Sequence, residues 1–369
     1  MSKESQMFYE GTYTDFGVQP NLLEINIGSN LLSLVEEENK GPLVEEVLWL
    51  RNKLDDELGL VLPKVRVRDS SYLKPDEYAL FFSGTEVAKS SVKIGYYLCL
   101  DTGTVTKSLD NTEFEKTKDP AYGMDGFIVP ENELEKAKEA GYLCVTPEKI
   151  IRTHFYEIIR KNITKILNQS NVNEIVEKVR RTNPDVITDV FFTKRFSISD
   201  MKILLNRLLK EHVSIRDMNT ILETIADYLD EEKKPLQLAE KVRERLAPMF
   251  LKEYYDEKND LHVFKFSQVV EDYLVEHAYF PGSKVDKPYL TLDPADRKRM
   301  IEILTKCISW FNAHNLLPVF VCVSSIRGVV SDFIKHEFPD SNVFSDMEIY
   351  SVKDLVTVRV EGEVCFDDK

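Results

Sequence analysis

Apolar residues recur along the chain with two different periods, and together they predict a mixed α/β protein. Alternating runs predict strands early in the chain, at residues 22–27, 65–68, 78–82 and 92–100. Steps of three and four over residues 41–58 predict a helix that Gly59 ends as its C-terminal cap. These elements define a first α/β subdomain made of residues 21–99.

The pattern is interrupted between residues 100 and 145. Residues 101–118 are polar and rich in turn formers, and they precede a short helix at 131–140 and a strand at 142–145. A longer helix then begins at Pro147 and turns an apolar face inward. We therefore expect 100–145 to be a small inserted α+β subdomain, with residues 146–167 returning to the first subdomain.

The second half of the chain changes character twice. Residues 168–248 lack strand alternation and predict a helical subdomain, with helices at 172–182, 199–210, 214–229 and 235–246. Residues 249–369 alternate helices and strands again and predict a C-terminal α/β subdomain. Residues 1–20 have no periodicity and read as a flexible tail or linker. The expected fold class is thus a multidomain protein of α/β and all-helical parts.

Composition and charge argue against several classes of function. The chain is 43% hydrophobic with a formal net charge of −15, which disfavours binding to nucleic acid. The longest apolar run, 316–323, is far shorter than the ~18–20 residues of a membrane span, and no secretory signal is visible. Four of the five cysteines fall in strand-like runs or on an apolar helix face, at Cys99, Cys144, Cys307 and Cys322. We expect buried, reduced thiols and a cytoplasmic protein.

Residues with catalytic potential form no recognisable site. The sequence has no phosphate-binding glycine loop, and its Cys and His residues lack the spacing of a zinc site. The pair His154 and Glu157 lies within one helical turn, where a structural role is the simpler interpretation. We therefore expect no enzymatic activity, no cofactor and no metal.

One loop stands out from this ordinary background. The stretch DPAYGMDG, residues 119–126, places an aspartate, a tyrosine and a methionine close together in a frame of one proline and two glycines. Two interpretations fit this pattern. The loop is either a packed corner between the insert and the first subdomain, or a place where a partner docks.

Several colinear segments resemble the cytoplasmic domain of the export-gate protein of flagellar and virulence type III secretion systems, the FlhA family. The resemblance spans about residues 21–365, and the segments that carry it are LEINIGSNLLSLV (23–35), VRVRDSSYLKPDEY (65–78), DPAYGMDGFIV (119–129), IIRTHFYEII (150–159), EHVSIRDMNTILETIADY (211–228), YLTLDPADR (289–297) and PVFVCVSSIR (318–327).

The resemblance implies a cytoplasmic docking platform of a protein export apparatus that helps to order secretion. The implied partners are export chaperone–substrate complexes, components of the ATPase complex and the second export-gate protein. It also implies a homo-oligomeric ring, a nonamer in the family, with a monomer when the domain is isolated. In the family the full-length protein is anchored in the bacterial inner membrane through a segment that this sequence lacks. The DPAYG and TILE segments favour flagellar over virulence use.

The resemblance also implies a chaperone-binding dimple between the first subdomain and its insert. Its key positions fall here on Asp119, on Tyr122, where the family usually has Phe, and on Thr153. Val145 and Ile150 fall at its apolar wall, and Gly28 falls at a glycine associated with conformational change. An aromatic side chain in a shallow apolar site offers a large contact area, and a carboxylate beside it can fix orientation by a charge-assisted hydrogen bond.

Two other functions remain open on the residues alone. The chain could be a soluble scaffold or adaptor of the same fold with unrelated protein partners. It could also be an enzyme whose site has no recognisable motif. A specific turnover would favour the enzyme, whereas capture of secretion chaperones would favour the export platform.

Overall fold

A computed structural model describes residues 22–36, 41–109, 114–232, 234–283 and 286–366. The expected tail at residues 1–20 lies outside these ranges. The chain divides into two compact units, Met1–Ile166 and Leu167–Lys369, and each is described by itself. The finer division into four subdomains stays a prediction.

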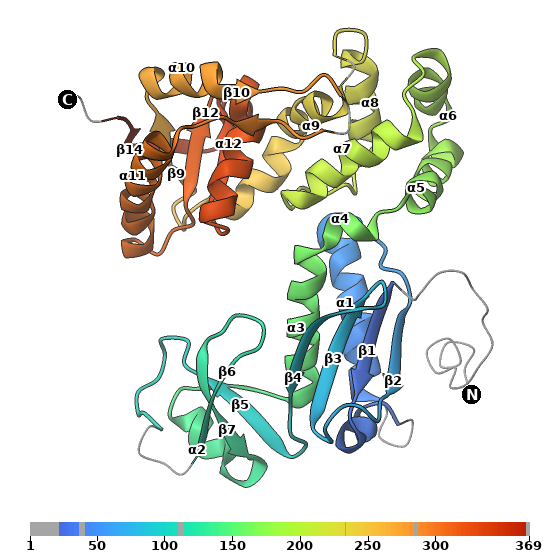
Figure 1. The fold of residues 1–369 in the computed structure, drawn as a ribbon, viewed down its shortest axis with the longest axis vertical. Helices are drawn as coiled ribbons and strands as arrows, with labels where there is room; N and C mark the ends of the chain where they lie inside the picture. Colours follow the sequence, from blue (N-terminus) through green and yellow to red (C-terminus); the bar gives the residue numbers. More distant parts are fainter. Residues whose placement is uncertain (1–21, 37–40, 110–113, 233, 284–285, 367–369) are drawn as a thin grey trace. The chain divides into compact units, whose positions relative to one another are not determined.

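The first unit contains a four-stranded mixed sheet in the order β2-β1-β3-β4. Its strands are β1 (Leu23–Ile27), β2 (Val65–Asp69), β3 (Glu77–Phe82) and β4 (Thr85–Ser91). The helical segments of this part are η2 (Ser29–Leu34), α1 (Pro42–Leu58), α3 (Pro147–Lys161) and α4 (Ile163–Ile166). Strand β1 is buried along its whole length, parallel to β2 and antiparallel to β3. Figure 1 shows α1 and α3 beside this sheet.

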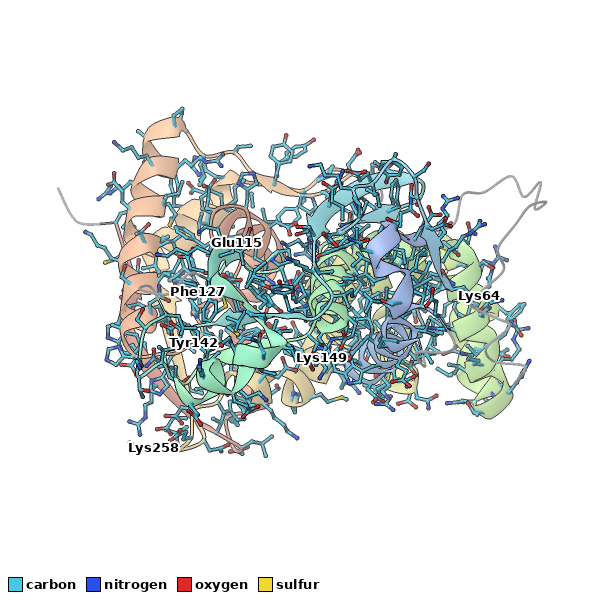
Figure 2. The ribbon with its side chains drawn as sticks, turned by 90° about the horizontal axis from the view of Figure 1, so that it is seen from below. Lys64, Glu115, Phe127, Tyr142, Lys149 and Lys258 are labelled. Carbon is cyan, nitrogen blue, oxygen red and sulfur yellow. The ribbon has the colours of Figure 1, made fainter. Side chains whose placement is uncertain are left out.

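The same unit holds a second, antiparallel sheet in the order β6-β7-β5-β8. Its elements are β5 (Tyr96–Leu100), β6 (Glu115–Lys118), β7 (Asp125–Pro130), η4 (Glu131–Glu133), α2 (Leu134–Glu139) and β8 (Leu143–Val145). Phe127 and Tyr142, labelled in Figure 2, pack edge to face in its small core with ring centroids 5.9 Å apart. The chain enters this sheet through β5 and leaves it through β8, which leads directly into α3.

The second unit begins with consecutive helices and ends with a parallel sheet in the order β13-β12-β9-β14. The helical segments are α5 (Gln169–Thr182), α6 (Pro184–Ile187), η5 (Thr188–Thr193), α7 (Ile198–Lys210), α8 (Met218–Tyr228), α9 (Pro235–Phe250) and η6 (Leu251–Tyr254). The remaining elements are β9 (Asp260–Phe266), α10 (Gln268–His277), β10 (Ala278–Tyr279), β11 (Tyr289–Leu290), α11 (Pro294–Ala313), β12 (Val319–Cys322), α12 (Ser324–Glu337), β13 (Asn342–Ser345), α13 (Asp346–Ser351) and β14 (Thr357–Val364). The expected fold class is confirmed.

A buried network of ion pairs joins the helices of the second unit to its parallel sheet region. Arg327 of α12 is fully buried and binds Glu211, which follows α7, and Glu240 of α9. Arg207 holds Asp332 of α12 with two bonds of 2.9 Å. Burial alone would lower the pKa of Arg327, but the carboxylates of Glu211 and Glu240 raise it well above its ordinary value. The guanidinium therefore stays charged inside the unit.

Three details of the expected secondary structure were wrong. The strand expected at 92–100 begins only at Tyr96, as β5, because residues 92–95 form no strand and turn at Gly95, whose φ is +79°. The helix expected from 214 begins at Met218, because the Asp217 side chain accepts the Thr220 N–H and caps it. The buried strand β9 was not foreseen. Among the described residues, no helix is both long and apolar enough to cross a lipid bilayer.

Candidate docking site

The corner at residues 119–124 is held together by its own aspartate. The Asp119 side chain is buried, and its Oδ2 accepts the backbone N–H of Ala121 at 3.1 Å and that of Tyr122 at 2.7 Å. Two backbone bonds of 2.8 Å, from Asp119 N to Met124 O and from Gly123 N to Asp119 O, close the turn. Gly123 has a φ of +71°, a conformation that glycine adopts without strain. Asp119 thus fixes the backbone from which Tyr122 projects.

Tyr122 is 59% exposed and contacts α3 through its hydroxyl. Its hydroxyl donates to Glu157 Oε1 at 3.0 Å. Partial burial and this bond to a carboxylate raise the pKa of Tyr122 to about 12, so the phenol stays protonated and remains a donor. A hydrogen-bonded aromatic ring with an exposed face is suited to a docking surface, whereas a packed corner would have buried the ring.

Helix α3 provides the surface on which this ring lies. Ile150, Thr153 and Glu157 are spaced by three and four residues, so they share one face of the helix. Thr153 is half-buried, and its hydroxyl donates to Lys149 O at 2.9 Å within the helix. Because Glu157 binds Tyr122, the structure brings the corner to the same helical face as Thr153.

The two expected wall residues lie at the entrance to α3. Val145 is the last residue of β8, is half-buried and pairs with Leu98 of β5. Ile150 is buried in the first turns of α3. They belong to the segment that leads from β8 into α3, whereas the hydrogen bond between the corner and α3 is the one from Tyr122 to Glu157.

A buried histidine lies beneath the corner. His154 Nδ1 and the Tyr78 hydroxyl of β3 share a hydrogen bond of 2.8 Å, and both side chains are buried. Burial lowers the pKa of His154, and the nearby Asp119 charge opposes this effect. The imidazole therefore packs as a neutral core group, in agreement with the structural role expected for it.

Gly28 lies elsewhere in the first unit and its role there is one of close packing. A Cβ atom added at Gly28 would lie 2.1 Å from Lys74 O and 2.5 Å from Pro75 O. Its N–H donates to Glu77 O at 2.8 Å, at the start of β3. Any larger residue must therefore displace the loop before β3, which makes this position sensitive to the arrangement of that loop.

Sequence reasoning proposed Asp119, Tyr122 and Thr153 as site residues but did not foresee two contacts, that of Glu157 with Tyr122 and that of Tyr78 with His154. Glu157 was noted only as a neighbour of His154, and Tyr78 only as a strand residue. Glu157 meets Tyr122 across 35 positions of sequence, and Tyr78 meets His154 across 76. Neither pairing leaves a local signal in the sequence.

The fold defines the class of protein first. The Chlamydia pneumoniae CdsV protein superposes with a TM-score of 0.80 at 21% identity, over 96% of this chain and all of that one. The nonameric EPEC SctV-C structure gives a TM-score of 0.73 at 20% identity, over 95% of this chain and all of that one. At this identity the likeness establishes the fold, which is that of SctV-type cytoplasmic domains.

The sequence then establishes the family. The FHIPEP family model matches residues 2–354, and the chain belongs to this family of export-gate proteins, which are not enzymes. The flagellar biosynthesis protein FlhA of Treponema pallidum is 30% identical over 341 residues, which is 92% of this chain and 47% of that protein. FlhA of Borreliella burgdorferi is 29% identical over 359 residues, 95% of this chain and 50% of that protein. The chain therefore spans about half the length of these relatives.

Proposed function

We propose that this chain is a docking platform of a type III protein export apparatus, of the flagellar kind, and that the corner at Tyr122 binds chaperone–substrate complexes. The observation that supports this proposal most directly is the exposed Tyr122 ring. Asp119 positions the ring by accepting two backbone N–H groups, and Glu157 accepts its hydroxyl on α3. Similarity to several FlhA proteins supports the flagellar apparatus over a virulence system.

Reversible recognition of a protein suits this site better than binding of a small molecule. An aromatic side chain with few rotatable bonds loses little entropy on contact, and such residues dominate interface energies. The carboxylate of Asp119 is already engaged by backbone donors, so it acts by holding the ring in place. The partner then meets the ring and the neighbouring face of α3 at Thr153.

Assembly into a ring belongs to the same proposal. Homologous cytoplasmic domains form nonamers in the EPEC SctV-C and EscV structures. A second export component is also implied, because CdsV has been solved as a complex with CdsO. We propose a monomer for the isolated domain and a ring in the assembled apparatus.

A chaperone titration of matched variants tests the docking site. The probe is a flagellar export chaperone loaded with its substrate, both from the organism that encodes this chain. Tyr122→Ala is expected to weaken binding by at least ~2 kcal/mol, about thirtyfold, because it removes the aromatic anchor. Tyr122→Phe keeps the ring and restores the residue usual in the family, so it is expected to bind within about threefold of the unchanged protein.

The control is Tyr350→Ala, which removes a tyrosine of matching exposure, 60% against 59%, from α13 of the second unit. It should leave the affinity unchanged. Equal affinity of well-folded Tyr122→Ala and unchanged protein would overturn the site. Failure of the unchanged protein to bind any loaded export chaperone would overturn the docking function itself.

A further inference from the structure

Two cysteines face each other where the chain enters and leaves the insert. Cys99 lies on β5 and Cys144 on β8, and the antiparallel register pairs them directly. Their Sγ atoms are 3.0 Å apart. The two cysteines are 45 positions apart in the sequence, and the corner that carries Tyr122 lies between them.

The backbone geometry at this pair already suits a disulfide. Directly opposed residues of antiparallel strands have Cα atoms about 4.5–5.5 Å apart, within the roughly 4.4–6.8 Å that disulfides span. A covalent bond therefore requires a rotation of side chains rather than a shift of either strand. Residue pairs at arbitrary places on a surface rarely meet this condition.

The two thiols differ in their access to solvent. Cys99 is fully buried in the small core of the insert, whereas Cys144 is half-buried on a strand at the edge of the sheet. Burial and the adjacent Cys144 thiol raise the pKa of Cys99. An oxidant from solution therefore meets Cys144 first, and Cys99 is placed to resolve the product.

We propose that Cys99 and Cys144 are a reversible, peroxide-sensitive dithiol. Their disulfide closes the neck of the insert, which we define as the paired strands β5 and β8. The Cys144 sulfur attacks the O–O bond of hydrogen peroxide, becomes a sulfenic acid and releases one water. The Cys99 sulfur then attacks the Cys144 sulfur, forming the S–S bond, and the hydroxyl leaves with the Cys99 proton as a second water. Peroxide gains the two electrons that the two thiols lose, and a dithiol or glutathione reverses the bond by exchange.

The disulfide links β8 covalently to β5, and β8 has only three residues and lies at the edge of its sheet. This strand leads through Thr146 into α3, the helix on which the Tyr122 ring lies. A cross-link here suppresses local opening in which β8 separates from β5, because the ends of the loop stay joined in the opened state. The bond thus acts on the connection between the insert and α3.

The chemical test uses the full chain treated with hydrogen peroxide, alkylated and digested without reductant. The expected product is a peptide pair joined between Cys99 and Cys144 that dithiothreitol separates. Cys144→Ser removes this product, and Cys99→Ala leaves a Cys144 sulfenic acid that dimedone traps. The control is Cys365→Ser, which removes the exposed cysteine of the second unit and should leave the cross-link intact.

Hydrogen exchange provides a second readout that needs no variant. Amides of β8 are expected to exchange at least about tenfold more slowly in the oxidised chain than in the reduced chain. Conversion of Cys144 to sulfinic acid without a cross-link, or a bond from Cys144 to another cysteine, would overturn the proposal. Unchanged exchange in the cross-linked chain would overturn the closing of the neck.

Discussion

Carboxylates organise both the Tyr122 corner of the first unit and the Arg327 network of the second unit, but they meet different groups. At the corner, Asp119 accepts two backbone N–H groups and the nearby aromatic ring stays exposed. In the network, Glu211 and Glu240 meet the guanidinium of a fully buried arginine. The corner thus presents a side chain outward from a fixed backbone, whereas the network joins elements that would otherwise leave charges unpaired.

This difference in burial indicates which side chains can be changed with little effect on the stability of the fold and which cannot. A change of the exposed Tyr122 ring removes contact area for the proposed partner and little of the core. A change of Arg327 takes the hydrogen-bonded cation from Glu240 and one of three cations from Glu211, which keeps Arg207 and Arg243. The free energy of unfolding should fall because of that loss. Stability measurements on variants of the two regions therefore distinguish an exposed side chain, whose loss costs little stability, from a buried ion-pair network, whose loss costs much.

The largest effect is expected from Arg327→Met. It should lower the free energy of unfolding of the second unit by ~3–5 kcal/mol, because Glu240 loses its hydrogen-bonded cation and Glu211 loses one of its three buried cations. Each unit holds one of the two tryptophans, Trp49 and Trp310. Urea unfolding followed by Trp310 fluorescence in a Trp49→Phe background therefore reports on the second unit.

Arg297→Met is the matched control, since the Arg297 side chain is 48% exposed and pairs with Glu337 on the surface of the same unit. Its cost should be ~0–1 kcal/mol. Equal costs for the two substitutions would show that the network is no more than a surface ion pair. The further change Glu240→Gln should recover part of the loss from Arg327→Met, because it removes the carboxylate that lost its hydrogen-bonded cation. Glu211 is left unchanged in this test because it still pairs with Arg207 and Arg243.

A smaller effect is expected from Asp119→Ala. The substitution leaves the N–H groups of Ala121 and Tyr122 without their acceptor, at a cost of ~1–3 kcal/mol to the first unit. Asp119→Asn keeps an oxygen at this position and should recover most of the loss. Trp49 fluorescence in a Trp310→Phe background provides the measurement.

Asp125→Ala is the control for this pair of variants. Asp125 lies in the same segment, its side chain is 87% exposed, and its ion pair with Lys118 is a surface one. Its removal should change stability by no more than ~0.5 kcal/mol. If Asp119→Ala cost as little as Asp125→Ala, the corner would not depend on its buried aspartate.

The parts of this molecule that sequence predicted best are those with local causes. Helix α1 ends at Leu58, as Gly59 predicted, because Gly59 takes a φ of +69° as the C-terminal cap. Strand β4 was missed because its residues, TEVAKSS, are mostly exposed and carry no apolar alternation. Its place in the sheet depends on pairing with β3, which the sequence of β4 alone does not show.

The candidate site shows the same division. The loop frame at Asp119 and Gly123 was visible in the sequence, because turn residues act on their own neighbourhood. The bonds from Glu157 to Tyr122 and from Tyr78 to His154 were not visible, because each joins distant parts of the chain. The pairing of Cys99 with Cys144 was hidden for the same reason, since two isolated cysteines in strand-like runs do not reveal their register.

The smallest expected effect is the pH dependence that His154 confers on the stability of the first unit. Burial among Tyr78 and the elements around α3 lowers the pKa of His154 in the folded protein below its ordinary value of 6.5, although the Asp119 charge pulls it upward. The unfolded chain therefore binds more protons than the folded chain as the pH falls below 6.5. Stability of the first unit should be full above that pH and should decrease until the pH passes below the folded-state pKa.

His154→Gln removes this titration while keeping a group that can hydrogen-bond the Tyr78 hydroxyl. The variant is expected to be less stable at neutral pH but to lose less stability between about pH 7.5 and 5.5 than the unchanged protein. Urea unfolding of the first unit, followed by Trp49 fluorescence at several pH values, measures both slopes. Identical slopes would mean that His154 is protonated in the folded protein as readily as in the unfolded chain. In that event Tyr78 and α3 would not shield the imidazole from solvent. The residues around His154 would then be packed less tightly than the Tyr78–His154 hydrogen bond indicates.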